Sequence, residues 1–579
     1  MKQLMLGNAA AARGLFEAGC EVISSYPGTP STEITEEAAK FKEIYCEWAP
    51  NEKVALESAF GACLAGRRAF CGMKHVGLNV AADPLYTMSY TGVNAGLVIG
   101  VADDPGMHSS QNEQDSRHHA IASKVPMLEP SDADEARRFA ALAFEISEKF
   151  DTPFLYKMCT RVAHSQSITE PAERIVPEHK SYEKTISKYV MAPANAIKRH
   201  PFVEQRMKDL EKWSETSGVN RVEVVSTGST TTGIITSSTS YQYVKEVLGD
   251  SVNILKLGMV NPLPADMIRK FADGLEKLIV VEELDPIIET FVRGLGLSCE
   301  IHGKDMFPIC GEFSQNLVAA AFGKEVPQGT KLDSVQIPVR PPIMCAGCPH
   351  RGMFYALNKL KVTVFGDIGC YTLGSVAPLS AMDVTLCMGA SFSGLHGWNK
   401  AGGAENEKKS VAVIGDSTFM HSGMTGLATI AYNQSNSTVI VLDNSITGMT
   451  GHQQNPTTGK NLYGDPAGRV DLEALARAMG INRVRVVDPY NIAECEAAVR
   501  EELEVAEPSL IISRRPCALL KEVKHNTPLV VDQDKCKSCK MCMKIGCPAI
   551  AMKGGKAKID NTLCVGCGVC SQMCKFGAL

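Results

Sequence analysis

The C-terminal end of the sequence is rich in cysteine at short, regular spacing. Eight of the 21 cysteines lie in residues 531–579 and form the runs C-x2-C-x2-C-x4-C and C-x2-C-x2-C-x3-C. Two such runs are the spacing by which a short chain holds two 4Fe–4S clusters, each run giving three thiolates to one cluster and its fourth to the other. We therefore expect one cluster on Cys536, Cys539, Cys542 and Cys574, and the other on Cys564, Cys567, Cys570 and Cys547.

The tail resembles a bacterial two-cluster ferredoxin, with two departures. One extra residue precedes Cys547, and Lys575 stands where proline often follows. Zinc is the alternative, because it also uses paired CxxC, but it prefers two pairs where each run here offers a triplet plus one. Residues 531–579 hold eight Lys against three Asp, a formal +5 that the thiolates of two clusters would offset.

Polar side chains follow two buried apolar runs further up the chain. Ser410–Gly415 predicts a strand that ends at Asp416, and Thr438–Leu442 predicts a strand that ends at Asp443 and Asn444. One crossover separates the two, so both ends should emerge at the same edge of a parallel sheet, where such sheets bind ligands. Carboxylate, amide and carbonyl oxygens suit Mg²⁺ with a diphosphate, and a helix N-terminus supplies N–H groups for that diphosphate.

This stretch resembles the thiamine-diphosphate motif, usually GDG followed by NN. Here the motif is Gly415-Asp416-Ser417 and Asp443-Asn444. The resemblance implies side-chain ligands to the metal at Asp416 and Asn444 and a carbonyl ligand at Ile446. The alternative is an ordinary Rossmann-like crossover with a capping Asp, although no GxGxxG opens this unit.

A thiamine enzyme also needs a Glu beside nitrogen N1′ of the aminopyrimidine ring, where it helps the coenzyme lose its C2 proton. Asn51 and Glu52 open a helix that offers this carboxylate, and Thr29 lies upstream in the loop SYPGTPSTE. The structural alternatives are a first-turn acid favoured by the helix dipole and a helix start with Thr29 as N-cap before Pro30.

Strand-like runs alternate with helical patterns over most of the chain, which indicates parallel sheets covered on both faces. The fold class is therefore α/β and multidomain, with a small C-terminal two-cluster α+β domain. We expect domains at 1–165, 221–325, 341–520 and 530–579, with residues 166–220 as a linker that contains some helix.

Four features occur together in this one chain: a YPxTP loop, an Asn-Glu helix start, a thiamine-like magnesium motif and a two-cluster tail. Together they resemble the 2-oxoacid:ferredoxin oxidoreductase superfamily over essentially the full length. The segments PPIMCAGCPHRG, GDIGCYTLG and GDSTF are similar to the large subunit of its indolepyruvate branch. The resemblance implies that 1–165 is a pyrimidine-binding-like domain with Thr29 and Glu52 near the thiamine. It implies a transketolase C-terminal-like domain at 221–325 and a thiamine diphosphate and Mg²⁺ domain at 341–520.

The resemblance also implies an activity: oxidative decarboxylation of aryl pyruvates to arylacetyl-CoA and CO₂, with coenzyme A as acyl acceptor. Electrons would pass through the clusters to an external ferredoxin, and a smaller beta subunit would complete the enzyme. Three alternatives remain open: another oxoacid in the same superfamily, a non-redox thiamine decarboxylase or carboligase, and a non-catalytic electron carrier.

Related enzymes hold a third, proximal 4Fe–4S cluster with a CxxC pair, a cysteine about two dozen residues later and a distant cysteine after proline. Cys345, Cys348, Cys370 and Cys517 are the counterparts here. The alternative is that they are buried core cysteines.

Arg117, His118 and His119 lie where a group that binds the substrate carboxylate is expected, with a solvated polar loop as the alternative.

The composition limits the classes of protein to which the chain can belong. Hydrophobic residues make up 45% and charged residues 21% of the 579, which is ordinary for globular proteins. A net charge of −5 argues against a chain-wide basic field for nucleic acid. No run of 18 apolar residues predicts a membrane helix, and the N-terminus indicates an amphipathic helix rather than a signal peptide. The cytoplasm is the expected compartment.

Overall fold

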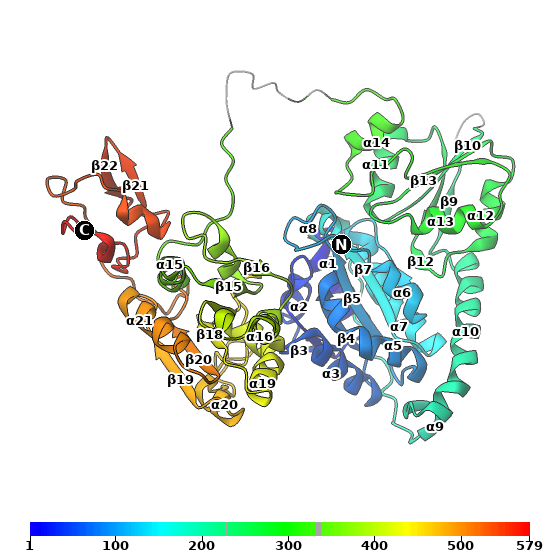
Figure 1. Cartoon of the computed structure of the whole chain (residues 1–579). Helices are drawn as coiled ribbons and strands as arrows, with labels where there is room; N and C mark the ends of the chain where they lie inside the picture. The colour runs from blue at the N-terminus through cyan, green and yellow to red at the C-terminus, as the bar shows by residue number, and fades with distance from the viewer. Residues whose placement is uncertain (226–229, 328, 330–336) are drawn as a thin grey trace. The chain divides into compact units, whose positions relative to one another are not determined.

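The computed structural model describes residues 1–579 except 226–229, 328 and 330–336. The chain divides into two compact units, Met1–Leu332 and Asp333–Leu579. Each unit has its own parallel sheets and its own hydrophobic cores. Figure 1 follows the chain through both units by colour.

The first unit is built on a seven-stranded sheet in the order β12-β6-β7-β5-β4-β2-β3. Its strands are β2 (Val22–Ser25), β3 (Tyr45–Trp48), β4 (Ala69–Lys74), β5 (Leu97–Asp103), β6 (Met127–Leu128), β7 (Phe154–Cys159) and β12 (Met259–Asn261). All neighbours pair in parallel except β12 with β6. Every residue of β4, β5 and β7 is buried, as expected when helices cover both faces of a parallel sheet.

The helices of this sheet come from the segments between its strands. Leu56 of α3 (Glu52–Leu64) and Leu85 of α5 (Ala82–Thr91) lie in one core cluster with alternate residues of β5. Helix α7 (Ala133–Phe150) contacts β5 and β7 and packs against α1 (Gly7–Glu17). These helices hold the carboxyl ends of the strands, where the candidate residues lie, in a fixed arrangement.

The stretch expected to be a linker contains regular structure. β8 (Gln166–Thr169) pairs antiparallel with β1 (Gln3–Leu6), and α10 (Pro193–Thr216) is a helix of 24 residues. A second sheet follows in the order β14-β13-β10-β11-β9, in which only β9 runs antiparallel to its neighbour. Its strands are β9 (Arg221–Glu223), β10 (Thr232–Ser237), β11 (Asn253–Leu257), β13 (Lys277–Val281) and β14 (Glu300–His302), with α11 (Ser238–Leu248), α12 (Ala265–Ala272), α13 (Ile287–Gly294) and α14 (Gln315–Ala321).

The second unit contains a six-stranded, fully parallel sheet in the order β16-β15-β17-β18-β20-β19. Its strands are β15 (Thr363–Gly366), β16 (Val384–Thr385), β17 (Ser410–Gly415), β18 (Thr438–Asp443), β19 (Arg483–Val487) and β20 (Ser509–Arg514). Its helices include α15 (His350–Leu360), α16 (Ala390–Gly402), α19 (Met424–Tyr432), α20 (Leu472–Ala478) and α21 (Ile492–Leu503). The two strands expected from the buried apolar runs, β17 and β18, are direct neighbours.

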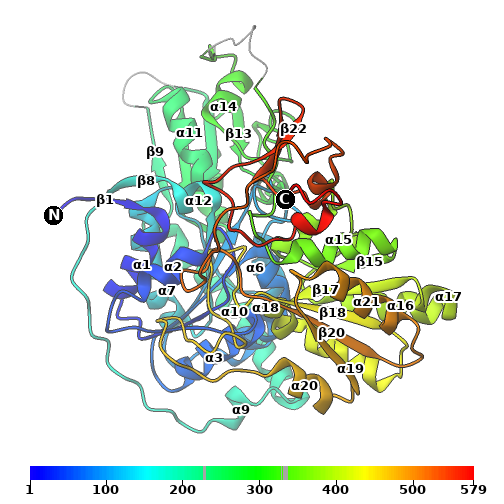
Figure 2. The ribbon, with the colours of Figure 1, turned by 90° about the vertical axis from the view of Figure 1, so that its left-hand side faces the viewer.

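The C-terminal tail is a small domain of the same unit. A hairpin of β21 (Ile550–Lys553) and β22 (Lys556–Ile559) and the short helices η3 (Met541–Ile545) and η4 (Ser571–Met573) enclose an apolar core. The tail lies beside α15 in both views (Figures 1 and 2), and η3 contacts that helix. Among the described helices, none combines the length and the apolar character needed to span a bilayer.

Candidate functional site

Three oxygen atoms converge at the carboxyl edge of the six-stranded sheet. Asp416 starts α18 (Asp416–Thr418) directly after β17, and Asn444 follows β18. The side-chain oxygen of Asn444 faces the carbonyl oxygen of Ile446 and Asp416 Oδ1. Only with the amide turned over would its nitrogen donate to them, at 2.9 and 3.0 Å. A cluster of oxygens without a donor among them is the donor set that a hard cation such as Mg²⁺ takes.

The surroundings of Asp416 change the pKa of its carboxyl group. It is buried, with 2% of the residue exposed, and the hydroxyl of Thr457 donates to its Oδ2 at 3.0 Å. Burial raises the pKa of Asp416 to about 7, and the neighbouring carboxylate of Asp443 adds to the rise. Arg514 donates to Asp443 Oδ2 at 2.9 Å. A cation among these oxygens would lower the pKa of Asp416 again, since an opposite charge favours the carboxylate.

Glu52 is held in a defined position at the carboxyl edge of the seven-stranded sheet. It is the first residue of α3 and 5% exposed, and Asn51 caps the helix by accepting from the N–H of Val54 at 2.9 Å. Gly77 in α4 (His75–Val80) leaves room for the carboxylate, because a Cβ there would lie 2.5 Å from Glu52 Oε1. A carboxylate that served only the helix dipole would need neither burial nor a glycine opposite it.

Thr29 lies at the same edge, in the loop between β2 and α2 (Thr32–Ala38), and is half-buried. Helix α2 begins at Thr32 after Ser31, so the alternative of Thr29 as an N-cap does not hold. A Cβ on Gly28 would lie 2.9 Å from the Cβ of Lys74, so this loop closes over the end of β4. Because β4, β2 and β3 are neighbours, Thr29 and Glu52 follow adjacent strands.

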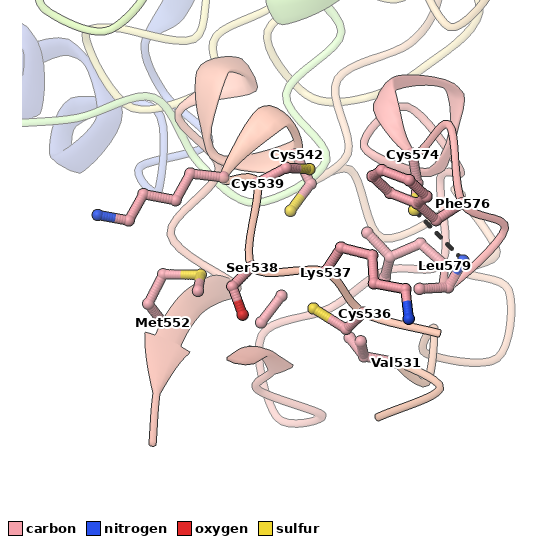
Figure 3. A pocket seen from close by; sticks show the side chains of 13 residues that line it. Val531, Cys536, Lys537, Ser538, Cys539, Cys542, Met552, Cys574, Phe576 and Leu579 are labelled. Atoms are coloured by element: carbon pink, nitrogen blue, oxygen red, sulfur yellow. Dashed lines mark hydrogen bonds between the residues drawn. The ribbon is translucent and has the colours of Figure 1, made fainter. Parts of the chain in front are cut away.

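The eight tail cysteines line two separate hollows, four to each. In Figure 3, Cys536, Cys539, Cys542 and Cys574 point their sulfur atoms into one hollow. Cys547, Cys564, Cys567 and Cys570 line the other. The backbone N–H of Ala578 donates to the sulfur of Cys574 at 3.3 Å, a bond that favours a thiolate. The division of the cysteines between the hollows is the crossover arrangement expected from their spacing.

Four further cysteines come together between these hollows and the oxygen cluster. Cys345 and Cys348 precede α15, with the N–H of Cys348 donating to the carbonyl of Cys345 at 3.2 Å. Burial raises the pKa of the Cys370 thiol to about 11, and nearby Cys517 and Cys345 add to the rise. The N–H of Cys517 donates to the carbonyl oxygen of Asn444 at 2.9 Å. This group of four therefore lies one hydrogen bond away from the oxygen cluster.

The loop of residues 345–348 also borders the tail. Ala346 and Gly347 line the hollow of the Cys547 group. The hydroxyl of Tyr490 donates to the carbonyl of Gly347 at 2.6 Å and so fixes the loop. The cysteine groups thus follow one another in a row: the Cys345 group, the Cys547 group, and then the Cys536 group, which reaches the surface at the exposed Cys539.

Comparisons with known proteins agree with this geometry. Residues 13–226 match the family model described as pyruvate flavodoxin/ferredoxin oxidoreductase, thiamine diphosphate-binding. Residues 367–513 match the C-terminal TPP binding domain of thiamine pyrophosphate enzymes, and residues 557–579 match a 4Fe–4S binding domain.

Curated relatives match along the whole chain. The indolepyruvate oxidoreductase subunit IorA of Pyrococcus horikoshii is 41% identical over 100% of this chain and 96% of its own length. That of Archaeoglobus fulgidus is 39% identical over 100% of this chain and 97% of its own. The chain belongs to the IorA family. The α/β fold class expected from the sequence and its place in the 2-oxoacid:ferredoxin oxidoreductase superfamily are confirmed, as are binding domains for thiamine diphosphate and 4Fe–4S clusters.

Of the three residues expected to bind the substrate carboxylate in this IorA-family chain, the expectation is wrong for Arg117. Arg117 is fully buried and pairs with Asp115 and Glu282, with N–O distances of 2.6 Å to each. His118 pairs with Asp285 at 2.7 Å, and His119 contacts Asn79 at 3.0 Å. The guanidinium of Arg117 is therefore taken up by structural ion pairs and is not available to a substrate carboxylate.

Two residues of this IorA-family site were not expected from the sequence. Thr457 reaches Asp416 from a loop 41 positions along the chain, and no local pattern marks it. Arg351 lies in the segment PPIMCAGCPHRG, yet two of its partners are in the tail, 194 and 195 positions away. A cation three residues after a CxxC pair was the only signal that pointed to it.

Proposed function

We propose that this IorA-family chain oxidatively decarboxylates aryl pyruvates of the indolepyruvate type to arylacetyl-CoA and CO₂, with ferredoxin as electron acceptor. The single observation that carries the proposal is the hydrogen bond from the N–H of Cys517 to the carbonyl of Asn444. It joins the oxygen cluster suited to a metal diphosphate to the first of three cysteine groups. Support for the substrate class comes from the IorA relatives.

Asp416, Asn444 and the carbonyl of Ile446 would hold Mg²⁺ and, through it, the diphosphate of thiamine diphosphate. The hydroxyl of Thr457 fixes one oxygen of Asp416, which leaves the other for the metal. When bound, the coenzyme supplies a nucleophilic carbon for the 2-oxo group and a sink for the electron pair left by CO₂. Glu52, buried and positioned by its helix cap, would hold the proton at N1′ of the aminopyrimidine ring.

Oxidation of the substrate carbon releases two electrons, and a ferredoxin accepts one at a time. Per turnover, one oxoacid carboxylate and one coenzyme A thiol become one acyl-CoA and one CO₂, two ferredoxins each take up one electron, and one proton is released. The three cysteine groups offer one-electron stations for 4Fe–4S clusters between the oxygen cluster and the surface. The proposed stations are Cys345, Cys348, Cys370 and Cys517; then Cys547, Cys564, Cys567 and Cys570; then Cys536, Cys539, Cys542 and Cys574.

The proposal includes a smaller beta subunit, because the relatives are named as subunits of an oxidoreductase, and a cytoplasmic location. The test is anaerobic co-purification of this chain with that subunit from the same organism, followed by ferredoxin reduction assays with coenzyme A. Indolepyruvate and phenylpyruvate should give acyl-CoA at least about tenfold faster than pyruvate or 2-oxoisovalerate. A preference for the aliphatic oxoacids would assign another branch of the superfamily, and free aldehyde without ferredoxin reduction would show a non-redox decarboxylase.

The iron content tests the third station separately. Three 4Fe–4S clusters give about twelve iron atoms per chain. The variant Cys370→Ser should lower the count to about eight and slow ferredoxin reduction, while Cys495→Ser, a core cysteine of α21, should leave both unchanged. About eight iron atoms in the fully active wild-type enzyme would remove the third cluster from the proposal.

A further inference from the structure

Arg351 is a buried cation in the first turn of α15, and 4% of the residue is exposed. On one side its guanidinium donates to the carbonyls of Met344 and, at 3.2 Å, Cys345. On the other side it donates to the carbonyls of Ile545 at 3.1 Å and Gly546 at 2.6 Å. One side chain therefore joins the CxxC loop to the segment that precedes the crossover cysteine of the tail.

The charge of this side chain is not matched by a carboxylate. Arg117, which is equally buried, has Asp115 and Glu282 as ion-pair partners. In the part of the chain that the structure describes, the hydrogen-bond partners of Arg351 are backbone carbonyls alone. Burying a charge costs several kcal/mol unless an opposite charge compensates it. The position therefore calls for a nearby anion.

Cysteines of two groups lie where bound clusters would supply that anion. Arg351 lines a hollow together with Cys348 of the first group and with Cys547, Cys567 and Cys570 of the second. When each group holds a 4Fe–4S cluster, its thiolates and iron give a net negative charge, which grows by one when the cluster is reduced. A guanidinium keeps its proton at all physiological pH values, so its charge is constant.

The unusual spacing of the first tail run accounts for how the contact forms. Four residues separate Cys542 from Cys547, and they include Gly546 with a φ of +67°. A Cβ at this position would lie 2.9 Å from Pro378 Cδ and 3.2 Å from Arg351 Nη1. The additional residue thus brings two carbonyl oxygens onto the guanidinium, and glycine allows the close approach.

We propose that Arg351 is a positioning residue of the electron relay, a fixed positive charge shared by the clusters of the Cys345 and Cys547 groups. It stabilises the reduced form of both clusters and fixes their positions relative to each other for electron transfer between them. The cluster of the Cys536 group lies outside its hollow and keeps its own potential. This inference rests on the proposed function, because it needs the cluster of the Cys345 group.

The test is an EPR-monitored redox titration of the complete enzyme, with iron content measured on each sample. In Arg351→Gln, two of the three clusters should become harder to reduce, with the ratio of reduced to oxidised form at a fixed potential lowered at least about tenfold. For a one-electron couple that is a shift of about 59 mV to lower potential. The third cluster should not shift, and Arg351→Lys, which keeps the charge, should stay close to the wild type.

Lys359→Gln is the matched control, because Lys359 is on the same helix but exposed and paired with Glu496. It should shift no cluster. Full iron with unchanged potentials in Arg351→Gln would overturn the proposal. If that variant loses iron, Arg351→Lys decides: an equal loss of iron would show a clamp for the tail without an electrostatic role, and retained iron with wild-type potentials would support the proposal. Fewer than three clusters in the wild type would instead count against the proposed function.

Discussion

At the residue scale, the two candidate carboxylates have different requirements for their function. Asp416 must be ionised to bind a cation, yet burial and Asp443 hold its pKa near 7 without one. Glu52 needs a fixed position, which its helix cap and Gly77 provide. The two residues are therefore separable by experiment: one should control binding of the coenzyme and the other its reactivity.

Glu52→Gln should reduce turnover of the aryl pyruvate by about 10²–10⁴-fold, the range for loss of a general acid–base group. Iron and thiamine diphosphate content should remain at wild-type values, because the amide has the same shape. The control is Glu57→Gln, five residues further along α3, exposed and paired with Lys53. Steady-state rates with saturating substrate measure the effect, and near-normal turnover of Glu52→Gln would refute the assigned role.

Asp416→Asn should weaken Mg²⁺-dependent binding of thiamine diphosphate by at least about 100-fold, because a metal ligand charge is lost from a buried site. Iron content should not change, since the cysteine groups do not include this residue. Isothermal titration with the coenzyme and Mg²⁺ measures the affinity, and Asp465→Asn in an exposed loop serves as control. An affinity within about twofold of the wild type would contradict the metal site.

At the scale of elements, the helices after β4 and β3 position Glu52. α3 brings Glu52 to the strand edge, and α4 passes close enough that Gly77 and the carboxylate are in contact. Packing of helix on helix therefore sets the direction of the carboxylate. A change in the helix that does not carry the acid should then disturb the chemistry.

Gly77→Ala should reduce turnover by about tenfold or more, because its methyl group would lie 2.5 Å from Glu52 Oε1 and displace it. Gly61→Ala is the matched control, since Gly61 is on α3 with open space around it. Replacing a helical glycine by alanine there should raise stability by about 0.5–1 kcal/mol and leave turnover unchanged. Thermal unfolding and steady-state rates measure the two effects. Equal turnover in both variants would show that the contact between Gly77 and Glu52 has no functional role.

At the scale of the whole molecule, the tail tethers two thiolate groups beside the sheet that holds the oxygen cluster. Its first group opens at the exposed Cys539, between Lys537 and Lys540, which line the same hollow. Lys537 and Lys540 thus place part of the positive charge of residues 531–579 where electrons would leave. An acidic protein acceptor would be attracted there by charge complementarity.

Lys537→Glu with Lys540→Glu should slow reduction of an acidic ferredoxin by about tenfold at low ionic strength, and the difference should shrink as salt screens the charges. Reduction of a small viologen dye should be unaffected, because it needs no docking. Lys553→Glu with Lys558→Glu makes the same charge change at exposed hairpin residues that do not line the hollow, and should have little effect. Equal slowing in both double variants would show that net charge, and not this surface, controls the encounter.

The sequence by itself determined the parts of this protein that depend on local spacing. Three cysteines separated by two residues each can reach one cluster whatever the rest of the chain does, and paired runs of this kind exchange their fourth cysteines, so the division of the tail cysteines followed from the two runs. A buried apolar run that ends in Asp, with a second run one crossover later, likewise predicted two adjacent parallel strands with their polar ends together.

Only the tertiary structure decided the contacts between distant segments. Nothing near Thr457 shows that it reaches Asp416, and nothing near Arg117 shows that Glu282 neutralises it. The partners of Arg351 in the tail are equally invisible in the sequence. The physical reason is that these contacts arise from packing of whole elements, in which each side chain takes whichever partner the fold brings to it.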